Sequence, residues 1–255
     1  MSGILPTTAT INRLVAVYIG DGRKIVNKCL ADAGSHKTFR EIYELSLATD
    51  TILKGLSNKN LCPGLNAARS IVKRVPLLVG IGQSSVAETE LRRFVELILW
   101  AIYFTDHPIE WMNFIGKTGV GFSQDTRRPI SYAAHRELGF YLEYALELME
   151  TEPSGIGIKA VVNTKQAVKR LNAAVHAGRL AREVGTVPPH DDISDQVLRS
   201  FVKIQRLTFS SCSILLAAYR KSQFDQLNAV MRAYFDWLVG ANLRREVRKG
   251  PFGLV

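Results

Sequence analysis

Cysteine is scarce in this chain. Only three occur among the 255 residues, Cys29, Cys62 and Cys212, and none belongs to a CxxC pair or stands at zinc-ligand spacing from a histidine. This scarcity excludes a disulfide-stapled scaffold and a zinc finger, and it favours a reducing, cytoplasmic setting. We expect neither a metal ion nor a cofactor.

Long apolar runs are also missing. The most apolar stretches, residues 94–104 and 207–219, are shorter than the roughly 18 residues of a membrane-spanning helix, and they carry Glu96 or a run of serines. Residues 1–10 lack the basic and apolar regions of a signal peptide. The sequence therefore predicts a cytoplasmic protein that does not enter a membrane.

Acidic residues are fewer than basic ones. Lys and Arg number 33 against 23 Asp and Glu, which gives a formal net charge of +10. Such a balance favours binding to polyanions, of which nucleic acid is the commonest in a cell, although a simple role in solubility explains the same charge equally well. Hydrophobic residues make up 47% and charged residues 22%, which indicates a folded globular chain rather than a disordered one.

Strand patterns and internal repeats are not found, whereas apolar residues recur at helical spacing along most of the chain. We therefore predict an all-α fold. Residues 1–255 are expected to form a single helical domain. A division into lobes 1–115 and 129–255, joined by a loop at 116–128, is the alternative.

Local signals divide this fold into helices. Ser85 and Glu88 have capping-box spacing ahead of a long apolar run, so a core helix should begin there. The expected helices are 14–30, 39–56, 65–78, 85–105, 130–150, 160–184 and 194–248, the last with a break near 220–223.

The predicted helix 160–184 contains the most informative stretch of the chain. Its polar stripe carries Lys169, Asn172, His176 and Arg179, while neighbouring positions are apolar. We expect Asn172 to hydrogen-bond the imidazole of His176 and the two cations to favour a phosphate. Arg170 points about 120° away from His176, so it joins such a site only if another helix or subunit completes the pocket.

These residue types suit cleavage of RNA without a metal. His176 would take the proton of a 2′-hydroxyl or protonate the leaving oxygen, while an arginine stabilises the extra negative charge on phosphorus. Lys169 and Arg179 would hold the phosphate backbone. An amphipathic helix with a solvated basic edge explains the same residues without any site.

The segment from Arg170 to His176 resembles the Arg-x4-6-His motif of the HEPN superfamily. A second segment, Arg92 to Glu96, is similar to the Arg-x3-Glu helix found upstream of that motif in some helical families of this type. The resemblance implies a bundle of long antiparallel helices, to which this chain adds N-terminal helices. It also implies a homodimer or a subunit of a larger defence complex, in toxin, abortive-infection or antiviral systems whose members include many RNases.

The resemblance assigns catalysis to His176, Arg170 and Asn172, with RNA favoured over DNA as the target. One residue favours an alternative function. Leu171 directly follows the arginine, where many active members carry a polar residue. The alternative is therefore a non-catalytic basic subunit that holds nucleic acid or docks onto a larger effector complex.

Other charged residues complete the set of candidates. Arg92 and Glu96 are four residues apart and should form an ion pair, for which a structural bridge between helices is the favoured interpretation. Further cations precede a predicted helix or lie in the basic tail, where they either grip phosphates or are simply solvated. These are Arg127, Arg128, Arg244, Arg245 and Arg248.

Overall fold

The computed structural model confirms that the protein is all-α: its described residues form helices, and no β-strand occurs among them. The described residues are 33–57, 64–110, 137–151, 155–183 and 194–239 together with Lys24, Asn27 and Ala31, and for 173–183 the description covers the backbone only. The helices are α2 (Ala33–Leu56), α3 (Gly64–Gly80), α4 (Ser84–Asp106), α6 (Leu138–Glu150), α7 (Ile156–Glu183), α8 (Asp195–Tyr219), α9 (Lys221–Phe224) and α10 (Ala229–Val239).

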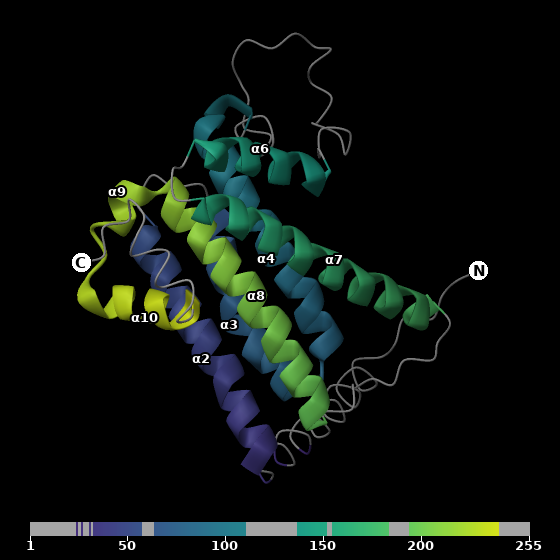
Figure 1. Ribbon diagram of the computed structural model, residues 1–255. Helices are drawn as coiled ribbons and strands as arrows, with labels where there is room; N and C mark the ends of the chain where they lie inside the picture. Colours follow the sequence, from purple (N-terminus) through teal and green to yellow (C-terminus); the bar gives the residue numbers. More distant parts are fainter. Residues whose placement is uncertain are drawn as a thin grey trace, which may run out of the picture.

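Helix α8 lies at the centre of the bundle and packs against α2, α4, α6, α7 and α10 (Figure 1). Its sequence explains this position, because apolar residues occupy several of its sides rather than one stripe. Phe209, for example, is fully buried and meets Phe94 of α4 edge to face, with ring centroids 5.0 Å apart. Helices from before and after residues 111–136 thus share one hydrophobic core.

Polar side chains on α8 are buried together with the apolar ones. Gln205 donates hydrogen bonds from Nε2 to the Ile42 carbonyl and the Ser46 hydroxyl of α2, each at 3.0 Å. Thr208 donates to the carbonyl one turn earlier, at 2.7 Å. Because buried polar groups are costly unless they are paired, the contact of Gln205 fixes how α2 lies against α8.

The predicted start of the core helix at Ser85 is wrong by one residue. Helix α4 begins at Ser84, and Gln83 precedes it without a side-chain cap. The reason is the tight turn before it. Gly82 has a φ of 75°, and the Gln83 amide donates to the Leu78 carbonyl of α3 at 2.8 Å, so the chain enters α4 directly from this turn.

The predicted helix from 194 onwards has one more break than expected. The expected break at Arg220 is present, and a second one at residues 225–228 separates α9 from α10. Side-chain caps mark the starts of α8 and α10: the Ser194 hydroxyl accepts from the Val197 amide at 3.3 Å, and the Asn228 side chain accepts from the Met231 amide at 2.9 Å. Helix α9 begins without a side-chain cap.

Two other predicted helices have different limits. Helix α7 begins at Ile156, directly after Gly155 with a φ of 64°, and not at 160. Helix α6 begins at Leu138, and the predicted start at 130 lies outside the described residues.

The junction between α6 and α7 generates a stability prediction. A Cβ atom on Gly157 would lie 2.9 Å from Cβ and 2.8 Å from Cγ of Met149, atoms close to the backbone of α6 that cannot move aside easily. We expect Gly157→Ala to lower the free energy of unfolding by about 1–3 kcal/mol, measured by urea denaturation.

Gly139→Ala is the matched control, since both glycines are the second residue of their helix and nothing lies within 4 Å of a Cβ at Gly139. It should leave stability unchanged or raise it by up to about 1 kcal/mol through helix propensity. Equal effects of the two substitutions would contradict the close approach of α6 and α7.

Candidate functional site

The stretch singled out in the sequence lies on α7, and its first part is described in full. Val168 and Leu171 are buried against the core, whereas Lys169 and Arg170 are exposed and Asn172 is half-buried between the two sides. The predicted separation of an apolar face from a polar stripe is therefore confirmed over these positions. The side chains of His176 and Arg179 lie outside the described part, so the expected bond between Asn172 and the imidazole stays a prediction.

Asn172 makes a contact that the sequence did not predict. Its Oδ1 accepts a hydrogen bond of 2.7 Å from Nε of Arg92, which lies on α4 and is 80 residues away in the chain. Nη1 of the same guanidinium donates to Oε1 of Glu96, one turn further along α4, at 2.5 Å. The two segments that resemble HEPN motifs thus meet at Arg92.

This geometry corrects the interpretation of Arg92 and Glu96 as a bridge between helices. Their ion pair lies within α4, and the link between helices is the hydrogen bond from Arg92 to Asn172. The side chain of Arg92 is 18% exposed and that of Glu96 is 34% exposed, so the charges are only partly desolvated. Such a pair contributes little net stability but fixes the orientation of the guanidinium.

Arg92 retains donors for a further partner. A guanidinium has five N–H groups, and the bonds to Asn172 and Glu96 use two of them. The rest have no partner among the described residues, and no nitrogen of Arg92 is both buried and unsatisfied. An anion that approached α7 beside Asn172 would meet an oriented guanidinium.

The fully described part of α7 carries only positive formal charge. Between residues 156 and 172 it has Lys159, Lys165, Lys169 and Arg170 and no carboxylate. The last three are exposed and form no ion pair with any described residue. Lys165 was missed in the sequence, although it precedes Lys169 by four residues and therefore continues the same stripe towards the start of the helix.

The remaining sequence candidates are five arginines outside the cluster. Arg127, Arg128, Arg244, Arg245 and Arg248 lie outside the described residues. Within the described ranges, no group of three acidic, histidine or cysteine side chains could hold a metal ion. The assembled site therefore consists of Arg92, Glu96 and Asn172 together with the cations of α7.

A second polar cluster ties α4 to α6 and α8. The carboxylate of Asp106 accepts 2.7 Å and 2.6 Å hydrogen bonds from the hydroxyls of Tyr144 and Tyr219. Burial, with the hydrogen bond to Asp106 and its charge, raises the pKa of both tyrosines above the usual range, so they stay protonated donors at neutral pH. This arrangement ties the C-terminal ends of α4 and α8 to the middle of α6.

Comparisons with known proteins found no match for this chain. No family model matches the chain, and neither a curated protein nor a solved structure is significantly similar to it. No helix in the described ranges combines the length and hydropathy that crossing a bilayer requires.

The contact between Arg92 and Asn172 can be tested by a double-mutant cycle. Arg92→Met leaves Glu96 and Asn172 without their partner, so we expect a loss of about 1–3 kcal/mol in unfolding free energy. Combining it with Asn172→Ala should show a coupling of about 1 kcal/mol.

Arg74→Met is the control for loss of an arginine. It breaks the 2.6 Å pair of Arg74 with Glu90, but the arginine is 53% exposed, so the cost should stay within about 1 kcal/mol. Zero coupling between positions 92 and 172 would contradict the described contact.

Proposed function

We propose that the protein is an RNA-binding protein of the HEPN type that cleaves RNA without a metal, with the α4–α7 face as its binding surface. The single observation that carries this proposal is the bond from Arg92 to Asn172. It brings an oriented arginine to the helix that bears His176. A homodimer or a larger defence assembly is part of the same proposal.

Binding rests on the uncompensated charge of α7. Lys165, Lys169 and Arg170 are exposed cations on a stretch without carboxylates, which suits the repeated charge of a phosphate backbone. Such contacts are independent of base sequence. Arg92 adds a fixed fork of N–H groups, and a guanidinium of this kind matches the geometry of phosphate oxygens.

Cleavage is assigned to His176. In one form of this step the imidazole accepts the proton of a 2′-hydroxyl and water protonates the departing 5′-oxygen. In the other form water takes up the 2′-hydroxyl proton and the imidazolium protonates the 5′-oxygen. The 2′-oxygen forms a bond to phosphorus as the bond to the 5′-oxygen breaks, which yields a 2′,3′-cyclic phosphate and a 5′-hydroxyl. Arg92, anchored by Glu96 and Asn172, would stabilise the charge on the phosphoryl oxygens. It takes the role first expected of Arg170.

One observation favours the non-catalytic alternative. Leu171 is 1% exposed and belongs to the core, so the position after Arg170, where many active members carry a polar residue, is not accessible to RNA here. Under this alternative the same cations hold nucleic acid for a larger effector complex. The two functions share the binding surface and differ only in cleavage.

RNA binding should depend steeply on salt. In the double variant Lys165→Gln, Lys169→Gln, we expect the slope of log affinity against log salt to fall by about 1.4, because each lost phosphate contact removes about 0.7 on single strands. Fluorescence anisotropy with a labelled RNA at several salt concentrations measures this slope. Lys54→Gln, which removes an exposed cation from α2, should leave it unchanged. Equal slopes in all three proteins would exclude the α7 face.

Cleavage should depend on one histidine. His176→Ala is expected to abolish the release of 2′,3′-cyclic phosphate ends from total RNA while RNA binding persists. The control His36→Ala alters an exposed histidine on α2 and should retain full activity. Undiminished degradation by the His176 variant would rule out the mechanism. Salt-dependent binding with no cleavage by the unaltered protein would instead support the non-catalytic subunit.

A further inference from the structure

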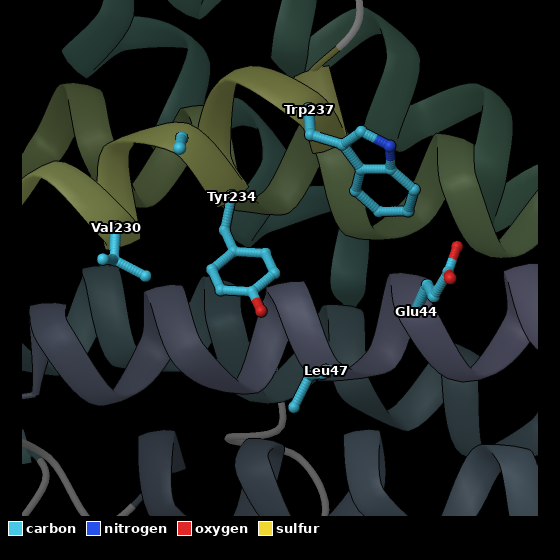
Figure 2. Close-up of a pocket in the computed structure, with 6 residues that line it drawn as sticks. Glu44, Leu47, Val230, Tyr234 and Trp237 are labelled. Atoms are coloured by element: carbon cyan, nitrogen blue, oxygen red, sulfur yellow. The ribbon is translucent and has the colours of Figure 1, made fainter.

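A groove lies between α2 and α10, away from the face proposed to bind RNA. Its volume is about 550 Å³, and it is lined by Leu47 and Glu44 of α2 and, from α10, by Val230, Ala233, Tyr234 and Trp237. Figure 2 shows the rings of Tyr234 and Trp237 projecting from α10 towards α2, with the Glu44 side chain facing Trp237 across the groove. The volume is that of a site for a small molecule.

Contacts of α10 with α2 and with α8 fix the shape of the groove. Gly55 of α2 lets α10 approach, since a Cβ there would lie 2.5 Å from Leu227 and 2.6 Å from the sulfur of Met231. Elsewhere, Arg206 of α8 stands 5.2 Å from the centroid of the Trp237 ring and also pairs with Glu41 at 2.9 Å. A ligand would thus enter a preformed site.

Both walls of the groove carry exposed apolar side chains that are not part of the hydrophobic core. Val230 is 63% exposed because α10 turns its Phe235 side inward. Leu47 is 42% exposed on the opposite wall. The hydroxyl of Tyr234 has no hydrogen-bond partner among the described residues. These groups favour a ligand with an apolar part.

The charge of the lining decides which apolar ligand fits. Among the described residues that line the groove, Glu44 alone is charged, and two aromatic rings stand beside it. Aromatic faces attract cations, and the ring of Trp237 already receives the guanidinium of Arg206. A carboxylate beside aromatic rings is a lining that recognises an organic ammonium group.

We propose that this groove binds a small organic cation, a quaternary or substituted ammonium with an apolar arm. The charged head lies between Glu44 and the rings of Trp237 and Tyr234, and the arm lies over Leu47 and Val230. This site is separate from the proposed RNA-binding face and does not depend on it.

A cation of the protein itself, Arg40, competes with a ligand for the carboxylate of Glu44. Oε1 of Glu44 accepts a 2.7 Å hydrogen bond from Nε of Arg40, one turn earlier on α2. Arg40 is 72% exposed, and an exposed pair at this spacing is weak enough for a ligand cation to displace. Removing Arg40 should therefore strengthen ligand binding, whereas removing the charge of Glu44 should weaken it.

The experiment is isothermal titration of the full chain with hexyltrimethylammonium, compared with choline and with the uncharged carbon isostere of choline. We expect saturable binding of both cations, tighter for the one with the longer arm, and none of the isostere. Glu44→Gln should weaken binding of hexyltrimethylammonium about fivefold, and Arg40→Gln should tighten it about twofold. Glu143→Gln, the same charge change at an exposed position on α6, should change nothing.

Several results would overturn the proposal. They are the absence of saturable heat with either cation, equal binding of the uncharged isostere, and equal effects of the Glu44 and Glu143 variants. Dimerisation that Val230→Ser abolishes, in a protein that ignores the ammonium probes, would assign the groove to a second copy of the chain. Because the variants are at exposed or half-exposed positions, unfolding should not obscure the comparison, and circular dichroism checks this.

Discussion

Burial of α8 on several sides is the constraint on which the rest of the structure depends. A helix with apolar residues around most of its circumference cannot face water, so α2, α4, α6, α7 and α10 must cover it. Each of these helices then has one face committed to the core and another left for solvent. The positions of the polar stripes are a consequence of this packing.

Basic and acidic side chains lie on different helices of the resulting surface. With Val168 and Leu171 committed to the core, the lysines of α7 are left outside on a stretch without carboxylates. The described α6 carries Glu143, Glu147 and Glu150 and no basic residue. A polyanion that approaches this protein is therefore attracted to one helix and repelled by its neighbour.

Much of the fold could be predicted from the sequence, because apolar residues recur at helical spacing in the core helices. The expected 65–78 corresponds to α3 at Gly64–Gly80, and 39–56 falls within α2. The errors concern helix limits, which are set by backbone turns and side-chain caps. Ser85 has the residue type of a cap, but the turn through Gly82 starts α4 before it. Asn228 caps the start of α10 and so marks a second break that the sequence did not predict.

The sequence by itself determined the all-α class, the basic balance and the polar stripe with Lys169 and Asn172, because these depend on composition and on spacing within one helix. Only the tertiary structure decided that Arg92 meets Asn172 and that Val230 and Trp237 line a groove with Glu44. Contacts between residues 80 or more positions apart depend on which faces of the neighbouring helices pack against α8. The spacing of residues within one helix does not predict that packing.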